Sequence, residues 1–315
     1  MKGTIRNIAY ILLLPAMTFT SCIRDEIEDC PPLQINIAVK DKNYFNVDNV
    51  EAEQRKGDNL AFREYVPTLY YVLRDLNTGD VVEESGVFEV KGDKQILPVD
   101  LCPCIPHGRY VLTVWGGMSN LDAISEDGLS LDLNPNSTEG EDIYMTNDTI
   151  LYDAWHNNHT VEMERTKGKL IIEKKWECLP EGINGSRKEI NGVYDNVNNA
   201  FKYTGITDVL ATHLWEPEQN IITKTVLSPS LKENGTKLHL DFINASDPSS
   251  PLLTPKDVKI TMKRNELTVL RYVWDCEKQD FVIYALLNNS WTIISQMDIE
   301  EIESISIFKD GAANN

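Results

Sequence analysis

The six cysteines have the most reactive side chains in this sequence of 315 residues. A thiolate can form a disulfide, hold a metal ion or accept a covalent group. The cysteines are Cys22, Cys30, Cys102, Cys104, Cys178 and Cys276. Disulfides are expected where the compartment is oxidising, so the location of the protein decides which chemistry these residues perform.

The segment that precedes Cys22 predicts export. Lys2 and Arg6 are followed by an apolar run of 12 residues (8–19), which is too short to cross a bilayer as a helix but typical of a signal-peptide core. Small residues at 20 and 21 and then Cys22 resemble a bacterial lipobox. We therefore expect residues 1–21 to be a signal peptide and Cys22 to carry lipid. The alternative is an ordinary secretory leader with an incidental cysteine.

Five cysteines remain for disulfides if Cys22 carries lipid. Cys102 and Cys104 are predicted to lie too close in an extended chain to bridge each other, because we expect their side chains to point to opposite faces of a strand and disulfide geometry is demanding. We expect Cys30 to pair with Cys102 or Cys104, and Cys178 to pair with Cys276. A zinc site at Cys102 and Cys104 is the alternative, although no second C-x-x-C motif or ordered histidine pair accompanies them.

The residues after Cys22 form an acidic tether (22–32). Asp25, Glu26, Glu28 and Asp29 resemble the acidic signal that exports some lipoproteins to the outer face of the outer membrane; the alternative is a solvated linker. The whole chain has a net charge of −19, which becomes −21 when residues 1–21 leave with their two cations. A surface this acidic repels phosphate backbones, so nucleic acid is not an expected partner.

The sequence contains no constellation typical of an enzyme. It has no G-x-S-x-G, P-loop, G-x-G-x-x-G or H-E-x-x-H motif. His156 and His159 are three residues apart, but their segment has the pattern of a loop entering a strand. Carboxylates are too abundant for any pair to be diagnostic. We predict a protein that is not an enzyme and has no cofactor or metal.

Two kinds of surface site are possible in an exported protein. Trp155 and Trp215 border polar segments and could stack on sugar rings, whereas the tryptophans within apolar strands are predicted to pack in a core. Asp148, Thr149 and Ile150 match the Asp-Ser/Thr-aliphatic pattern of a bacterial O-glycosylation site, which makes Thr149 a glycosylation candidate.

Short runs rich in Val, Ile, Leu, Thr and Tyr, separated by Asn, Asp, Gly and Pro, predict strands throughout the chain. Residues 109–116 are apolar on both faces, as expected of a central strand. About seven strands in each part predict two tandem β-sandwiches, 33–165 and 166–315, that meet near the charged stretch 163–169. The acidic segment 117–142 is expected to be a loop at one end of a sandwich.

Several stretches resemble one known family. "TLYYVLRDLNTGDVVEE" (68–84) is similar to its strand-turn-strand motif, "CIPHGRYVLTVWGG" (104–117) to the strand that follows, and "EMERTKGKLIIE" (162–173) to the passage between its domains. With the lipoprotein leader, these motifs resemble the FimB-like fimbrial anchor lipoproteins of Bacteroides-type bacteria. The likeness covers most of 22–175. Arg74 and the Cys102-Pro103-Cys104 segment depart from the pattern.

The resemblance implies two transthyretin-like β-sandwich domains on an outer-membrane lipid anchor, with other fimbrial subunits as partners. Such subunits join by strand complementation, in which an extended segment of one completes a sheet of another. The candidate segment here is Ser304, Ile305, Ser306, Ile307 and Phe308, in which apolar and polar residues alternate. It could instead be an ordinary last strand of the second domain. The rival functions are a surface glycan-binding lipoprotein of a polysaccharide uptake system and a hydrolase built from scattered carboxylates.

Overall fold

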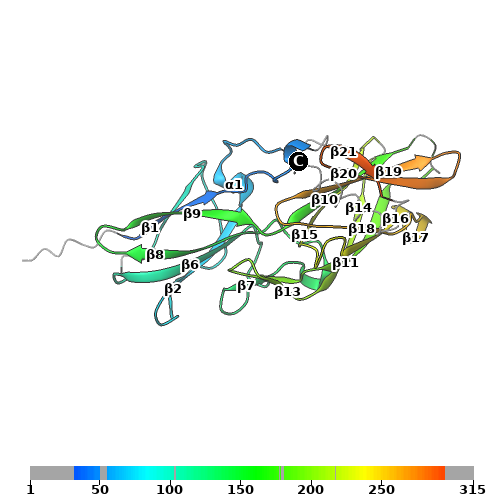
Figure 1. Cartoon of the computed structure of the whole chain (residues 1–315). Coiled ribbons are helices and arrows are strands. Elements are labelled where there is room, and N and C mark those ends of the chain that lie inside the picture. Colours follow the sequence, from blue (N-terminus) through cyan, green and yellow to red (C-terminus); the bar gives the residue numbers. More distant parts are fainter. Residues whose placement is uncertain are drawn as a thin grey trace, which may run out of the picture. The chain divides into compact units, whose positions relative to one another are not determined.

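The computed structural model describes residues 32–49, 55–102, 104–176, 178, 181–216 and 218–294 (Figure 1). Within these residues nearly all the regular structure is β, with one α-helix of four residues (α1) and two short 3-10 helices. The elements up to residue 165 are β1 Gln34–Val39, η1 Val47–Asn49, α1 Phe62–Tyr65, β2 Thr68–Asp75, β3 Val81–Glu84, β4 Phe88–Glu89, β5 Leu97–Asp100, β6 Gly108–Gly116, β7 Ser130–Asp132, η2 Pro135–Ser137, β8 Tyr144–Tyr152 and β9 Asn158–Arg165.

The elements that follow are again strands. They are β10 Gly168–Lys175, β11 Gly185–Val193, β12 Asn196–Asn198, β13 Tyr203–Thr204, β14 Thr207–Leu214, β15 Ile221–Leu227, β16 Thr236–Asn244, β17 Asp247–Leu253, β18 Val258–Ile260, β19 Leu267–Asp275, β20 Asp280–Leu287 and β21 Ser290–Ile293. Below, "first half" means the described residues 32–165 and "second half" means those from 168 to 294. The prediction of an all-β sandwich fold is confirmed.

In the first half, two sets of strands enclose one core. β3, β2, β6 and β8 pair in that order, and β9, β1 and β5 continue from β8 through a short β8–β9 contact at two residue pairs. The β2–β3 hairpin turns where Gly79 has φ 78° and the Asp75 side chain accepts hydrogen bonds from two turn amides. Inward side chains of all these sheets form the core, among them Ile35, Ile37, Leu69, Leu112 and Val161.

The central strand of the first half is β6, as its sequence predicts. It pairs with β2 on one side and along its full length with β8 on the other. Leu112 and Val114 point into the core described above, while Trp115 lies on the opposite face, fully buried. The Trp115 indole donates a hydrogen bond to the Gly128 carbonyl at 2.9 Å. Residues 117–142 therefore fold back over the outer face of this sheet, which corrects the prediction of a loop at the end of a sandwich.

The second half is also a sandwich. One sheet has the order β15-β10-β19-β20-β21, and the other has the order β14-β11-β16-β17 with β18 beside β16. β10 and β19 run parallel, and the remaining neighbours are antiparallel. The core between the sheets is rich in aromatic rings: Phe242 contacts Trp176, Trp215, Tyr272 and Phe281 with ring centroids 5.1–6.1 Å apart.

Candidate functional site: the junction of the two halves

The connection between the first and second halves is buried; the domain boundary near 163–169 stays a prediction. β9 ends at Arg165 and β10 begins at Gly168, with Thr166 and Lys167 between them. All three connecting side chains are buried, with 2% of Arg165 and 0% of Thr166 and Lys167 exposed. Two buried cations within three residues, Arg165 and Lys167, are unusual, because a buried charge destabilises the fold unless it is paired.

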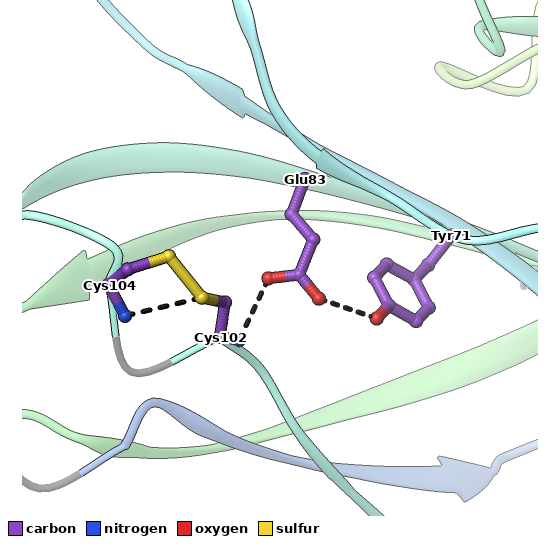
Figure 2. The surroundings of a disulfide bond; sticks show 4 residues. All are labelled: Tyr71, Glu83, Cys102 and Cys104. Carbon is purple, nitrogen blue, oxygen red and sulfur yellow. Dashed lines mark hydrogen bonds between the residues drawn. A yellow bond between two sulfur atoms is a disulfide. The ribbon is translucent and has the colours of Figure 1, made fainter.

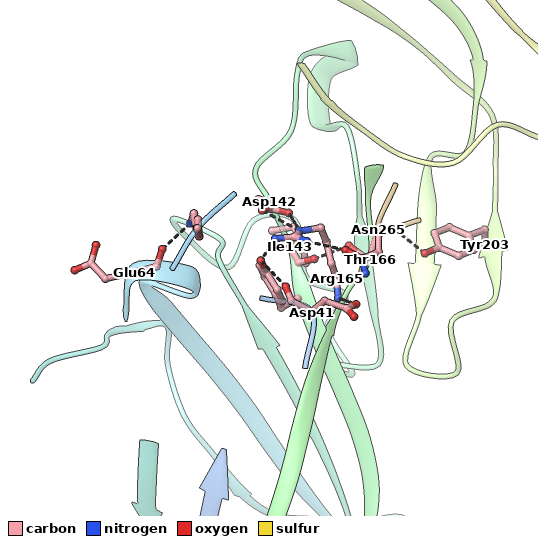
Figure 3. Close-up of polar contacts among 10 residues, drawn as sticks. Asp41, Glu64, Asp142, Ile143, Arg165, Thr166, Tyr203 and Asn265 are labelled. Carbon is pink, nitrogen blue, oxygen red and sulfur yellow. Dashed lines mark hydrogen bonds and ion pairs between the residues drawn. The ribbon is translucent and has the colours of Figure 1, made fainter. Parts of the chain in front are cut away.

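Arg165 has partners for its whole guanidinium group (Figure 3). Its Nε donates to the Asp142 carboxylate at 2.9 and 3.1 Å, its Nη1 donates to Asn265 Oδ1 at 2.7 Å, and its Nη2 donates to the Tyr144 hydroxyl. The group also lies 4.1 Å from the centre of the Tyr44 ring. Burial by itself would lower the pKa of Arg165, but Asp142 and the two tyrosines raise it above its usual range, so this side chain stays charged.

Lys167 has a different environment. Its Nζ donates to the Leu133 carbonyl, and no carboxylate is within ion-pair distance among the described residues. Burial therefore lowers its pKa to about 7, although Asp142 and Glu141 act in the opposite direction. Gly140 packs against it so closely that a Cβ there would lie 1.9 Å from the Lys167 Nζ. The connection thus contains one permanent cation and one that titrates near neutral pH.

A segment of the first half covers a sheet of the second half. Tyr44 and Val47 pack on the outer face of β10 and β19, together with Ile171 and Val269. The Phe45 amide donates to the Asn265 carbonyl at 2.8 Å. The Asn46 side chain both donates to the Leu267 carbonyl at 2.8 Å and accepts from the Leu267 amide at 2.7 Å, as an added strand would.

A segment of the second half covers a sheet of the first half in return. The β12–β13 hairpin pairs with β7 in a small three-stranded sheet, with Val197 opposite Leu131. Val197 is fully buried against Trp115 on the outer face of β6. Tyr203 donates a hydrogen bond from its hydroxyl to the Thr166 carbonyl at 2.7 Å, which fixes the hairpin to the connection (Figure 3).

A third contact closes the side of the second sandwich where β14 and β15 lie. Glu139, from the loop of the first half, accepts from Thr225 at 2.5 Å and pairs with His213 Nε2 at 3.2 Å. Lys188, which is 0% exposed, donates to Thr223 at 2.6 Å and lies 3.7 Å from Glu139. Burial lowers the pKa of Lys188 to about 8.

Electrostatics hold Glu139 in its ionised form. Burial would raise its pKa, but hydrogen bonds from His213 and Thr225 and the charge of Lys188 lower it overall. One bridge between Thr138 and Leu210 of β14 continues the contact. The 134–140 loop thereby covers part of the edge of β14, which would otherwise be a site for unwanted strand pairing.

The cysteines give one correction and one confirmation. Cys102 and Cys104 form a disulfide with each other, so neither is available to Cys30 as predicted (Figure 2). The prediction was wrong because it placed the two side chains on opposite faces of a strand. Residues two apart lie on the same side of the backbone, and this segment turns after β5, with the Ile105 amide bonded to the Cys102 carbonyl at 3.2 Å. The resulting Cα–Cα distance of 5.2 Å is ordinary for a disulfide.

The surroundings of this disulfide fix its place beside β3. Glu83 accepts the Cys102 amide at 2.9 Å through one carboxylate oxygen and the Tyr71 hydroxyl at 2.8 Å through the other (Figure 2). The second disulfide joins Cys178 to Cys276, as predicted. β10 and β19 are parallel, with Lys175 opposite Val273. Cys178 and Cys276 each lie three residues further along the chain, so they come close to each other.

The three candidate surface residues, Thr149, Trp155 and Trp215, differ in how exposed their side chains are. Thr149 is exposed on β8, and its amide donates to the Asp148 side chain at 2.7 Å; glycosylation there stays a prediction. Trp155 is 89% exposed, in the turn between β8 and β9. Trp215 is only 6% exposed and packs on Phe242, so the prediction that it stacks on sugar rings is wrong. It was misjudged because the polar residues that follow it hide the fact that it closes the second core.

The histidine pair has no shared ligand. His156 Nδ1 lies 2.9 Å from Asp153, and His159 Nε2 lies 2.8 Å from the Leu151 carbonyl. Among the residues that the structure describes, no three His, Cys, Asp or Glu side chains could hold a metal together. In the same part of the chain, no helix has both the length and the apolar character needed to cross a membrane.

The remaining candidates lie outside the described residues. They are the lipidation site Cys22, the acidic residues Asp25, Glu26, Glu28 and Asp29, the thiol of Cys30, and the candidate strand 304–308. They stay predictions. Sequence reasoning missed Glu139, Lys188 and Val197, whose roles depend on contacts between segments about 50 to 90 residues apart.

Comparison with solved structures shows the fold. A candidate adhesin from Bacteroides thetaiotaomicron matches with a TM-score of 0.55 at 12% identity, over 84% of this chain and 98% of that one. A candidate polysaccharide-binding protein from the same species matches with a TM-score of 0.53 at 13% identity, over 84% and 98%. These two proteins share the fold of this chain.

Other comparisons add little. The fimbrial anchor protein Mfa2 from Porphyromonas gingivalis matches with a TM-score of 0.47 at 12% identity, over 84% of this chain and 100% of that one. No protein-family model matches the sequence, and no curated protein is significantly similar to it.

Proposed function

We propose that this protein is a non-enzymatic, lipid-anchored component of a fimbrium on the cell surface. The observation that carries the proposal is the fold: sandwiches throughout, of the kind found in a candidate adhesin. The lipobox at Cys22 and the motifs around Tyr110 and Arg165 that resemble fimbrial anchor proteins support it. Its location would be the outer membrane, with lipid on Cys22 as the attachment and fimbrial subunits as partners.

The junction suits a protein that bears load between a membrane and a filament. Each half covers a sheet of the other, through Tyr44 and Val47 in one direction and Val197 in the other. Arg165 ties the connection to Asn265 in the second half. Pulling the halves apart would expose buried apolar surface, remove Asn265 from Arg165 and separate Lys188 from Glu139, which opposes separation.

Strand complementation is the proposed way of joining other subunits. β21 is at the edge of its sheet and is the last described strand, and the alternating segment 304–308 follows it in the sequence. An extended segment of this kind can complete a partner's sheet through backbone hydrogen bonds, while Ile305 and Ile307 fill pockets on one face.

The anchor role is tested with Cys22→Ala in a strain that makes fimbriae. Because the lipid would be the membrane attachment, we expect the protein and its fimbriae to move from the cell fraction to the medium, as measured by immunoblot and electron microscopy. Cys30→Ala is the matched control, since it removes a cysteine but keeps the lipidation site. Fimbriae that stay attached in Cys22→Ala cells would refute the anchor role.

The strand role needs a separate variant. Ile305→Asp with Ile307→Asp should leave the protein on the membrane but prevent co-purification of other fimbrial subunits, because charges cannot enter apolar pockets. The matched control replaces the alternate residues, Ser304→Asp with Ser306→Asp. If both double variants retain the subunits equally, the joining segment lies elsewhere.

A glycan-binding surface lipoprotein is the second candidate, favoured by the exposed ring of Trp155. A glycan array would show binding that Trp155→Ala abolishes. Trp215→Ala is not an informative variant, because Trp215 belongs to the second core.

A further inference from the structure

A cleft lies where the β12–β13 hairpin meets the second sandwich. It has a volume of about 460 Å³, within the usual range for small-molecule sites of about 300–1,000 Å³. Aromatic and apolar walls come from Phe201, Tyr203 and Met262, and three cations line it: Lys232, Lys263 and Arg264. Glu233 is the one acidic lining residue. This is a local excess of positive charge in a chain whose net charge is −19.

Arg264 has hydrogen-bonding capacity that the protein does not use. Its Nη2 donates to Glu164 at 2.6 Å, while its Nη1 is buried and has no hydrogen-bond partner among the described residues. A buried guanidinium donor without a partner costs free energy, so a ligand atom that accepts from it would be stabilised.

Lys263 and Lys232 differ in whether a nearby carboxylate offsets their positive charge. Lys263 lies 3.8 Å from Glu266, whereas Lys232 is exposed and forms no ion pair within the described part of the chain. The cleft therefore presents the ammonium of Lys232, which has no ion-pair partner among the described residues, and is lined by the Arg264 guanidinium group. Both favour a ligand with a negative charge.

Phe201 lines this cleft, and its backbone has a conformation that is unfavourable for a bulky residue. Its φ is 54°, in the left-handed region that a bulky residue rarely adopts. Hydrogen bonds from the Phe201 amide to the Asn198 carbonyl (3.0 Å) and from the Lys202 amide to the Asn198 side chain (2.9 Å) maintain the turn. The Arg264 guanidinium lies 4.3 Å from the centre of the Phe201 ring. Backbone strain of this kind persists where the surroundings impose it, often at binding sites.

We propose that this cleft binds a saccharide bearing a carboxylate, such as a terminal uronic acid. The carboxylate pairs with Lys232 and with the Arg264 guanidinium, and the apolar face of the sugar ring packs on Phe201. A long polyanion is disfavoured, because the chain as a whole has a net charge of −19. A single charged sugar at the end of a glycan meets only the local positive charge.

The test is titration of the purified protein with glucuronate, followed by ligand-observed NMR. Glucose is the neutral analogue, and inorganic phosphate and a tri-glutamate peptide represent other anions. We expect saturable binding of glucuronate, no binding of glucose, and weaker binding of both other anions. Binding should weaken as salt concentration rises.

Variants locate the binding. Lys232→Gln should weaken glucuronate binding about tenfold, as for loss of one charged contact. Phe201→Asn should do the same; asparagine tolerates the positive φ, and thermal unfolding of the variant measures what the lost ring contacts with Arg264 and the buried cluster beside it contribute to stability. Lys259→Gln is the matched control, an exposed lysine on β18 that does not line the cleft.

Three results would overturn the proposal. They are the absence of saturable glucuronate binding, binding that Lys232→Gln and Lys259→Gln reduce equally, and phosphate or tri-glutamate binding at least as tight as glucuronate. These outcomes are independent of Cys22 and of fimbrial attachment, so the fimbrial proposal stands or falls separately.

Discussion

Arg165 and Lys167 are two buried cations in one short connection, and their surroundings give them opposite properties. Arg165 has a carboxylate, an amide and two tyrosine rings around it, which together replace the water that it loses. Lys167 has a single carbonyl partner, so its neutral form is favoured at a pH where an exposed lysine would be charged. Their protonation therefore depends on the folded junction and could not be inferred from the sequence "RTKGK".

The pH dependence of stability follows from Lys167. Its pKa is about 7 in the folded chain but about 10.4 when unfolded, so between these values the unfolded chain binds more protons. The free energy of unfolding should therefore rise with pH over this range, by up to about 1.4 kcal/mol per pH unit from this residue. Lys188, with a pKa of about 8, acts in the same direction.

Lys167→Met isolates the contribution of Lys167 to the pH dependence of stability. Urea unfolding from about pH 7.5 to about pH 9.5 should show a smaller increase in stability with pH in Lys167→Met than in the parent protein. Lys259→Met, at an exposed position, serves as the control and should keep the parent slope. An unchanged slope in Lys167→Met would mean that Lys167 stays protonated when buried.

At the scale of elements, the strands build the sandwiches while the connecting segments join them. β6 was predictable because its residues are apolar on both faces, and it is buried on both. What covers its outer face was not predictable. Loop 117–142 and the β12–β13 hairpin meet there, and β7 and β12 pair although 64 residues separate Asp132 from Asn196.

Val197→Asp tests the hairpin contact. A charge placed against Trp115 without a partner should lower the free energy of unfolding by about 3 kcal/mol or more, and should speed hydrogen exchange at the amides of β7. Ile206→Asp, a similar change at a residue that is 69% exposed in the same region, should change stability by no more than about 0.5 kcal/mol. Equal effects of the two variants would show that the hairpin does not hold the halves together.

At the scale of the whole molecule, the two disulfides among the described residues constrain very different lengths of chain. The Cys178–Cys276 bond closes a loop with a sequence separation of 98, whereas Cys102–Cys104 spans only 2. Because a disulfide stabilises mainly by restricting the unfolded chain, the longer loop should matter more. The long bond also ties the ends of the parallel strands β10 and β19 at the centre of one sheet.

Paired substitutions compare the two bonds. Cys178→Ser with Cys276→Ser should lower the free energy of unfolding by about 4–5 kcal/mol, and Cys102→Ser with Cys104→Ser by about 2 kcal/mol or less, both measured by urea unfolding under oxidising conditions. A larger loss from the short pair would indicate that its contacts with Glu83 and Tyr71, rather than chain entropy, stabilise the first half.

The sequence by itself determined the class of fold, because alternating apolar residues and turn residues act locally. Tyr110, Leu112 and Val114 had to face one core, and Gly79 had to turn the β2–β3 hairpin. It also indicated the Cys178–Cys276 bond. Only the tertiary structure decided the contacts between distant segments: the Cys102–Cys104 pairing, the burial of Trp215, the partners of Glu139 and the cleft at Arg264. Such contacts depend on which segments meet in space, and no local pattern of side chains specifies that.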